Sequence, residues 1–173
     1  VLDLNLLQYA PSSGSYRPKV YTYKYAMPGD KELPKAKMLI VNVDGPIVQA
    51  EMPSLDVLLF TPVMDDRVWW TGTGQDIYIA PRELHQKRQQ LIKIQAETGK
   101  TKVLISETAD TYIDVVSTSF GPPTIRTLKS GEIIWYSERD GWGHLYLYDN
   151  DGGLIGQITK GSWQVRKIVK VDE

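Results

Sequence analysis

The stretch Ile133–Asp149, IIWYSERDGWGHLYLYD, carries the clearest secondary-structure signal in this chain. Two runs rich in Ile, Leu, Trp and Tyr, Glu132–Ser137 and Gly143–Asp149, make up most of it, the first beginning one residue before it. Residues of these types are enriched in β-strands. Arg139-Asp140-Gly141 separates the runs and has the composition of a tight turn. The stretch therefore predicts two adjacent antiparallel strands.

The flanking segments extend this pair into a sheet. Downstream, the turn-like residues Asn150–Gly153 lead into a strand predicted over Leu154–Thr159. Upstream, Lys129-Ser130-Gly131 marks another turn, and Tyr112–Val116 is predicted as a further strand. Four short antiparallel strands are therefore expected, and Trp163–Val171 is expected to begin the next one.

The N-terminal half shows the same pattern of short β-rich runs separated by turn residues. Asp44-Gly45 is a strong hairpin signal between two of these runs. The predicted strands are Val20–Ala26, Met38–Val43, Ile47–Met52, Val57–Phe60, Val68–Thr71 and Ile77–Ile79.

Residues 82–95 have a composition that also suits a helix. Several of them are good helix formers. However, the apolar residues at the end of this segment run directly into Glu97-Thr98-Gly99-Lys100, which is a hairpin turn composition. We therefore predict a loop followed by a β-hairpin formed by Gln89–Gln95 and Lys102–Ser106.

A weak internal repeat supports an all-β architecture. Four positions superpose on four others at a constant offset of about 54 residues. They are Ile92, Ile94, Gly99 and Leu104, which align with Tyr146, Tyr148, Gly153 and Ile158. A period of about 50 residues with four strands in each unit is typical of β-propeller blades. The predicted fold class is all-β: a partial β-propeller of about three to four antiparallel four-stranded blades.

The run from Trp135 to Asp149 resembles the propeller domain of the dipeptidyl peptidase IV subfamily of prolyl-oligopeptidase-like serine peptidases. In that family, W-x-S-E-R-D-G-W-x-H-L-Y-L-Y-D heads the outer half of one blade. The similarity continues through Gln157–Gly161 into Trp163-Gln164-Val165, and looser matches lie between Tyr16 and Asp44 and between Leu91 and Asp114. The resemblance covers roughly residues 16–173. Residues 1–15 are expected to be an irregular lead-in or the remnant of a preceding blade.

The resemblance implies a non-catalytic role for these 173 residues. Family members are several times longer and carry a C-terminal α/β-hydrolase domain with a G-x-S-x-G nucleophile elbow. This sequence contains no G-x-S-x-G and no Glu-Glu pair of the kind that anchors the substrate's amino terminus in the family. It therefore resembles a propeller fragment that gates access to a hydrolase domain releasing N-terminal Xaa-Pro or Xaa-Ala dipeptides. The implied partners are that domain and a peptide, and the family implies a periplasmic or extracytoplasmic location.

Composition excludes several other classes. The chain has no Cys, which removes disulfides, thiolate nucleophiles and thiolate metal sites. Its net charge of -1 gives no basic field for nucleic acid. No apolar run approaches the ~20 residues needed to span a bilayer, and the first residues are not expected to be a signal peptide. We expect no cofactor.

The two histidines do not suggest a catalytic or metal site. A serine triad needs a nucleophile, a base and an orienting carboxylate within hydrogen-bond reach. His144 lies within a predicted strand and is expected to be a structural hydrogen-bonding residue on the sheet face. His85 lies in a polar loop and is expected to be solvated. Two isolated histidines without ligand spacing make a poor metal site.

The remaining candidate motifs favour structural roles. Asp149-Asn150-Asp151-Gly152 lacks the distal Glu of a calcium loop and is expected to be a hairpin turn. Asp65-Asp66 and Asp140-Gly141 are predicted turns, and Arg139 is a candidate to pair with a neighbouring blade. Gly72-Thr73-Gly74 lacks the third Gly of a dinucleotide fingerprint. Trp69, Trp70, Trp142 and Trp163 are expected to pack blades together. No residue is assigned a catalytic, cofactor-binding or metal-binding role.

One alternative function and one corollary remain open at this stage. The alternative is a stand-alone propeller-like module that binds protein or glycan, and the reading frame beyond Glu173 would distinguish the two. The corollary is self-association through open blade edges, because unpaired strand edges attract other strands.

Overall fold

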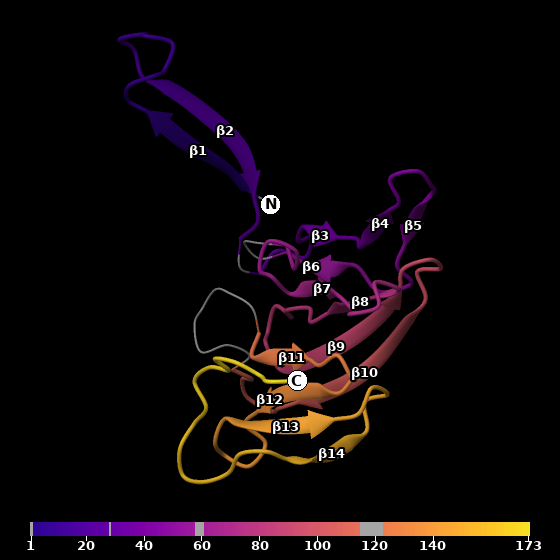
Figure 1. Cartoon of the computed structure of the whole chain (residues 1–173). Coiled ribbons are helices and arrows are strands. Elements are labelled where there is room, and N and C mark those ends of the chain that lie inside the picture. The colour runs from indigo at the N-terminus through magenta and orange to yellow at the C-terminus, as the bar shows by residue number, and fades with distance from the viewer. Residues whose placement is uncertain (1, 28, 58–60, 115–122) are drawn as a thin grey trace. The chain divides into compact units, whose positions relative to one another are not determined.

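A computed structural model describes residues 2–27, 29–57, 61–114 and 123–173 (Figure 1). Within these ranges the chain forms strands, turns and irregular segments, and no residue is helical. None of the described segments forms a helix long and apolar enough to cross a bilayer. The chain divides into two compact units, residues 1–35 and 36–173. The all-β prediction is confirmed.

The first unit contains a two-stranded antiparallel ribbon of β1 (Leu2–Gln8) and β2 (Lys19–Tyr25). One of its faces carries two polar pairs and one apolar pair: Lys24 forms an ion pair with Asp3 at 2.6 Å, the Thr22 hydroxyl donates to Asn5 at 2.6 Å, and Leu7 lies opposite Val20. The other face carries three cross-strand Leu–Tyr pairs. The ribbon confirms the strand predicted at Val20–Ala26, and β1 occupies much of the first fifteen residues. A domain boundary at residues 15–16 stays a prediction.

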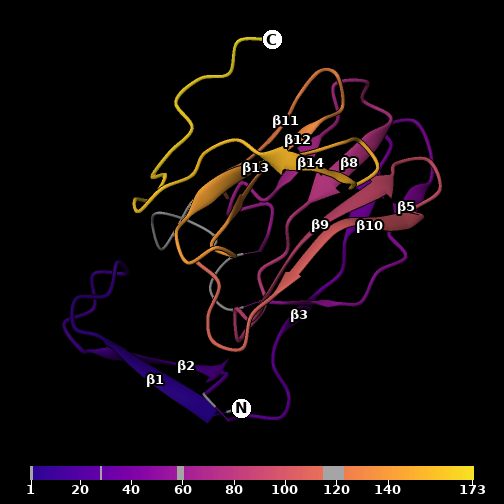
Figure 2. The ribbon, with the colours of Figure 1, turned by 90° about the horizontal axis from the view of Figure 1, so that it is seen from below.

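Two four-stranded antiparallel sheets form the centre of the second unit (Figures 1 and 2). In both sheets the spatial order follows the chain order, so each is a meander. The first sheet contains β7 (Val68–Trp70), β8 (Asp76–Ile79), β9 (Arg88–Gln95) and β10 (Thr101–Thr108). The second contains β11 (Ile125–Thr127), β12 (Ile133–Ser137), β13 (His144–Tyr148) and β14 (Leu154–Gln157).

Two shorter sheets precede these in the chain. β3 (Lys35–Ala36) pairs with β6 (Leu55–Asp56), and β4 (Leu39–Val41) pairs with β5 (Ile47–Gln49). The β4–β5 hairpin confirms the turn predicted at Asp44-Gly45. In the same way, the β9–β10 hairpin confirms that residues 89–106 form strands rather than a helix.

Apolar side chains fill the space between the two four-stranded sheets. One core cluster draws on both of them, and β12 is buried along its whole length. A second cluster packs the opposite face of the first sheet against the β4–β5 hairpin. The first cluster contains Tyr78, Ala80, Leu91, Leu104, Ile105, Ile125, Ile133, Trp135, Tyr146 and Tyr148.

Two glycine turns show how successive sheets stack. Gly99 and Gly152 lie in the hairpin turns β9–β10 and β13–β14, with φ of 76° and 92°. A Cβ on Gly99 would lie 2.4 Å from the Gln49 carbonyl oxygen, and a Cβ on Gly152 would lie 1.9 Å from that of Leu104. Each turn therefore packs directly on the last strand of the preceding sheet. The structural counterpart of Gly99 is therefore Gly152, one residue before the Gly153 that the sequence repeat aligns with it.

Three strand predictions differ from the structure. Tyr112–Asp114 form no strand, and Val115 and Val116 lie outside the described residues. The first strand of that sheet is instead β11, because Ile125–Thr127 pair with β12.

Trp163–Val171 is the second difference, because no strand is present there. A backbone hydrogen bond holds the segment in place: the Val165 amide donates to the Gly143 carbonyl at 2.7 Å. The third difference concerns Val57–Phe60: β6 ends at Asp56, and residues 58–60 lie outside the described part of the chain.

Candidate functional site

Arg139 joins the two four-stranded sheets through a polar clamp. It lies in the turn between β12 and β13 and reaches Glu107 on β10 of the neighbouring sheet. Its Nη2 donates to Glu107 Oε2 at 3.0 Å and to the Tyr148 hydroxyl at 2.7 Å. Its guanidinium carbon also lies 4.3 Å from the centre of the Tyr146 ring. The expectation that Arg139 pairs with a neighbouring blade is confirmed.

The carboxylate of Glu107 is held from the second sheet as well. It accepts hydrogen bonds from Trp135 Nε1 at 3.0 Å and from the Ser137 hydroxyl at 2.6 Å. Burial alone lowers the pKa of Arg139, but the hydrogen bond to Tyr148 and the charge of Glu107 outweigh it, so this pKa is raised. Arg139 therefore stays protonated and paired, which suits a structural role in joining the two sheets.

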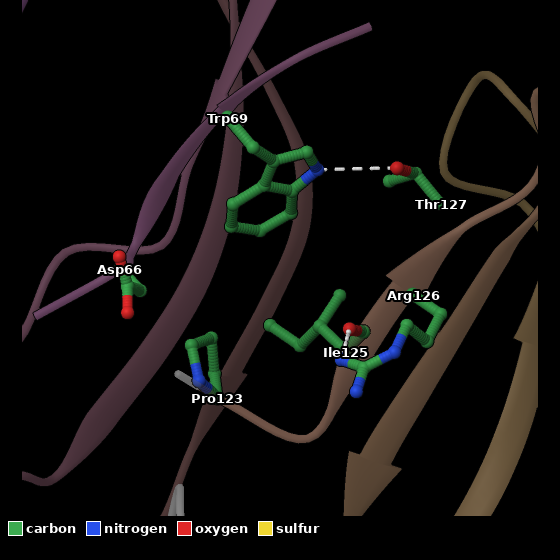
Figure 3. A pocket seen from close by; sticks show the side chains of 6 residues that line it. All are labelled: Asp66, Trp69, Pro123, Ile125, Arg126 and Thr127. Atoms are coloured by element: carbon green, nitrogen blue, oxygen red, sulfur yellow. Dashed lines mark hydrogen bonds between the residues drawn. The ribbon is translucent and has the colours of Figure 1, made fainter. Parts of the chain in front are cut away.

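A small pocket opens between β7 and β11, the first strands of the two sheets (Figure 3). In a propeller, blades surround a central channel, and the first strand of each blade lies nearest to it. The pocket has a volume of about 220 Å³. Its lining residues are Asp66, Trp69, Pro123, Ile125, Arg126 and Thr127.

Charged and aromatic groups give this pocket its chemical character. Figure 3 shows Asp66 and Arg126 on opposite sides, with the Trp69 indole between the sheets. Trp69 Nε1 donates to the Thr127 hydroxyl at 3.1 Å, which links β7 to β11. Arg126 Nη1 donates to the carbonyl of Ile125 at 2.7 Å. The volume suits a single side chain, since pockets for larger ligands measure ~300–1,000 Å³.

A buried ion-pair group supports the turn that carries Asp66. Asp65 Oδ2 lies 3.8 Å from Arg67 Nε and 3.6 Å from Arg82 Nη2. Arg67 Nη1 also donates to the Ala80 carbonyl at 3.3 Å. Burial, followed by repulsion from Arg82, lowers the pKa of Arg67 to about 10. The turn predicted at Asp65-Asp66 is confirmed, and Asp66 takes the left-handed conformation there, with φ of 52°.

Sequence reasoning did not find this buried group or the pocket. Asp65 was read only as a turn residue, although a carboxylate two positions before an arginine at the start of an apolar strand is a usable signal. Asp66 and Arg126 are far apart in sequence, so only the packing of the two sheets brings them to one pocket.

His144 has the structural role that its position predicts. It is fully buried, and its Nε2 lies 2.9 Å from the Gly161 carbonyl oxygen. Because a carbonyl only accepts, Nε2 carries the proton. Nδ1 lies 3.1 Å from the Thr159 hydroxyl, and the Trp163 ring stands edge-on at 5.0 Å. His85 is exposed, as expected.

The remaining candidate motifs form turns. Asp149–Gly152 connects β13 to β14, and Asp149 Oδ1 accepts from the amides of Asp151 and Gly153 at 2.9 and 2.7 Å. Gly72–Gly74 connects β7 to β8. Among the described residues, no group of three or more His, Asp and Glu side chains could hold a metal ion.

The prediction for the tryptophans is only partly correct. Trp69 packs against the core between the sheets, as expected. Trp70, Trp142 and Trp163 are each about half exposed. Trp70 points to the opposite face of β7 from Trp69, and Trp142 lies in the turn between β12 and β13. Trp135, within β12, is the fully buried tryptophan of that space.

Comparison with known proteins assigns the family. The family described as "Dipeptidyl peptidase IV (DPP IV) N-terminal region" matches residues 1–173, the whole chain. The chain belongs to this family. Its resemblance to the propeller region of dipeptidyl peptidase IV-like proteins, first indicated by Trp135–Asp149, is thereby confirmed.

Curated relatives and solved structures of the DPP IV family agree with this assignment. Dipeptidyl peptidase 4 of Trichophyton rubrum is 34% identical over 110 residues, which cover 61% of this chain and 14% of that protein. A probable dipeptidyl peptidase 4 of Emericella nidulans is 24% identical over 148 residues, which cover 81% of this chain and 19% of that protein.

Among solved structures, Porphyromonas gingivalis dipeptidyl peptidase 4 superposes with a TM-score of 0.77 at 24% identity. The superposition covers 99% of this chain and 23% of that one. A putative dipeptidyl aminopeptidase IV from Bacteroides ovatus gives a TM-score of 0.69 at 21% identity, covering 98% of this chain and 25% of that one. These similarities confirm the propeller fold. The chain spans a quarter or less of each of these four relatives.

Proposed function

We propose that this chain is part of the non-catalytic propeller of a serine exopeptidase that releases dipeptides from peptide amino termini. In this proposal, a separate α/β-hydrolase domain of the parent polypeptide supplies the catalytic triad. Pro or Ala in the second position of the substrate is the expected preference, by analogy with the family. The propeller walls off the hydrolase site and admits short or unfolded peptides.

The observation that carries this proposal is the pocket between β7 and β11. The pocket offers the Arg126 guanidinium, the Asp66 carboxylate and the Trp69 indole, and in this proposal it faces the channel along which a peptide enters. Such groups suit contacts with a peptide side chain. The DPP IV family match over the whole chain supports the same assignment.

Partners and location follow from the same proposal. The hydrolase domain and the peptide are the expected partners, and an extracytoplasmic location is expected from the family. The alternative of a stand-alone binding module predicts that the reading frame encodes no hydrolase domain. Sequencing the frame beyond Glu173 therefore tests the proposal first: a G-x-S-x-G elbow with Asp and His supports it, and a frame without them contradicts it.

A second experiment tests the role of the pocket. In the complete parent enzyme, we expect Arg126→Ala to raise the KM for a decapeptide with Pro in second place several-fold. The kcat for that peptide, and both constants for Ala-Pro-p-nitroanilide, should stay unchanged, because the small substrate does not extend along the propeller. Lys102→Ala is the matched control, since Lys102 lies on the exposed outer strand β10. Equal effects of the two substitutions would contradict a peptide-contacting pocket.

A further inference from the structure

Arg67 is a buried cation whose hydrogen-bonding groups are only partly used. It lies directly before β7 and is 1% exposed. Its Nη1 donates to the Ala80 carbonyl at 3.3 Å, but Nε and Nη2 have no hydrogen-bond partner among the residues that the structure describes. A buried guanidinium with unbonded N–H groups is unfavourable, because it has lost its hydration and regained only part of it from the protein. A further acceptor is therefore expected beside Arg67.

Asp65 does not supply this acceptor. Its Oδ2 lies 3.8 Å from Arg67 Nε, which is an ion-pair distance and too long for a hydrogen bond. The same oxygen lies 3.6 Å from Arg82 Nη2, so one carboxylate is shared by two guanidinium groups. The lowered pKa of Arg67 agrees with this geometry, since burial and repulsion from Arg82 outweigh the attraction of Asp65. Within the described part of the chain, Nη2 of Arg67 is left without an acceptor.

Gln89 is a second buried polar side chain on the same face of the sheet. Side chains alternate along a strand, so Arg67 shares a face with Trp69, and Gln89 shares a face with Leu91. Trp69 and Leu91 both pack in the core cluster between the two four-stranded sheets. Because β7 and β9 both run antiparallel to β8, their first residues lie at the same end of the sheet. Arg67 and Gln89 therefore occupy the same face at the same end.

The amide of Gln89 has unused hydrogen-bonding groups as well. The side chain is 1% exposed, and neither Nε2 nor Oε1 has a partner among the described residues. Glu107 lies opposite Gln89 in the β9–β10 register, but its two oxygens already accept three hydrogen bonds from Trp135, Ser137 and Arg139 of the second sheet. Buried polar groups are normally satisfied by protein, water or an ion. This end of the sheet therefore offers two buried donors to a small acceptor.

We propose that a chloride ion binds beside Arg67, where it accepts hydrogen bonds from Nη2 of Arg67 and from Nε2 of Gln89. Chloride only accepts hydrogen bonds, has no preferred coordination geometry, and is small enough for a site formed by side chains that are 1% exposed. It adds negative charge where Asp65 is shared by two guanidinium groups. A water molecule would add no charge and would need acceptors for its own two protons. The inference does not depend on the proposed peptidase role.

Thermal unfolding in different anions tests the inference. At constant ionic strength, replacing ~200 mM sodium gluconate by sodium chloride should raise the Tm of the 173-residue chain by at least ~4 °C, because a ligand that binds only the folded state stabilises it. Sodium bromide should act like chloride. An equal Tm in gluconate, chloride and bromide overturns the proposal, and ordered water is then the group that satisfies Arg67 and Gln89.

Bromide also locates the site directly. Crystals of the 173-residue chain grown in sodium bromide should show an anomalous scattering peak within hydrogen-bond reach of Arg67 Nη2 and Gln89 Nε2. Bromide peaks that lie only beside exposed side chains are adventitious ions only, and they contradict the proposal.

Three variants separate anion binding from general destabilisation. Arg67→Met removes the charge and the donors and should abolish the Tm gain in chloride. Gln89→Leu removes only the amide and should reduce that gain by at least half. Arg88→Gln is the matched control, because Arg88 is an exposed arginine of β9 that pairs with Glu83, and it should keep the full gain. A full gain in Gln89→Leu or in Arg67→Met contradicts this site. If Arg67→Met does not fold, Gln89→Leu and the bromide positions decide.

Discussion

Replacing Arg139 by Ala should selectively weaken the junction between the two four-stranded sheets. The substitution removes the bonds from Arg139 to Glu107, Tyr148 and Ser137, the last at 2.8 Å from Nε. It also removes the contact with the Tyr146 ring. Glu107 keeps its bonds from Trp135 and Ser137, so its carboxylate is not left without partners.

The expected loss follows from these contacts. A hydrogen bond to a charged group contributes ~1.5–3 kcal/mol to stability, and a cation–π contact at an exposed site contributes ~0.5–1 kcal/mol. The Arg139 side chain is 32% exposed, so solvent screening reduces the ionic part. We expect a loss of about 2–3 kcal/mol in the free energy of unfolding. For a protein of this size, that corresponds to a fall in Tm of about 5–10 °C.

Lys102→Ala is the matched control, because Lys102 also joins the two sheets. Its Nζ lies 2.6 Å from Asp151 Oδ1, but the two side chains are 55% and 77% exposed. An exposed pair of this kind contributes ~0–1 kcal/mol. Arg139→Lys, which keeps the charge but loses the forked geometry, should lie between the two.

Tryptophan fluorescence during thermal unfolding is the appropriate assay. All five tryptophans lie within residues 36–173, so the signal reports on the second unit and not on the β1–β2 ribbon. A Tm for Arg139→Ala no lower than that of Lys102→Ala would refute the reasoning. The partly buried Arg139–Glu107 pair would then contribute no more to stability than the exposed Lys102–Asp151 pair.

Three further substitutions, one of them a control, test other features of the second unit. Gly152→Ala should lower stability by at least ~3 kcal/mol, because a Cβ would lie 1.9 Å from the Leu104 carbonyl oxygen. Gly141→Ala, with the same φ of 92° and no atom within 4 Å, should cost only ~1 kcal/mol, and similar urea midpoints for the two variants would contradict the stacking contact. Burial, as the largest cause, raises the pKa of Tyr136 to about 12. The pKa of Tyr136 in the folded chain therefore exceeds the unfolded value of ~10. The stability that the protonated Tyr136 contributes is present below pH ~10 and is lost as the pH rises toward 12, because the unfolded chain loses this proton first. Tyr136→Phe should remove this alkaline loss, and urea unfolding at pH 8, 10 and 11 should show a smaller decline than in the unsubstituted chain.

Local sequence predicted the strands whose own composition determines them. Residues 133–149 combine dense β-formers with a turn of Asp and Gly, so β12 and β13 could be placed before any tertiary contact was known. The pairing of Arg139 with a neighbouring blade was predictable for the same reason, because placing the turn also placed its side chain at a sheet end. The internal repeat indicated propeller blades, although it aligned Gly99 with Gly153 and the equivalent turn residue is Gly152.

The remaining elements depend on contacts that the local sequence does not encode. β11 has three residues and follows two prolines, so it lacks a periodic pattern, and its pairing with β12 makes it a strand. Tyr112–Asp114 has the composition of a strand but no ladder partner among the described residues. The pocket combines Asp66, from the turn before β7, with Arg126 of β11. The sequence around either residue does not predict that the two lie near the same pocket.

The polar clamp and the pocket belong to the same interface between the two sheets. Arg139 and Glu107 join the ends of β12 and β10, whereas Asp66 and Arg126 lie on opposite sides of the pocket between β7 and β11 (Figure 3). Between them lies a buried apolar cluster with Trp135 near its centre, and such closely packed interiors transmit small shifts rather than absorbing them. The Trp69–Thr127 hydrogen bond and the Arg139–Glu107 pair therefore join the same two sheets at two different places.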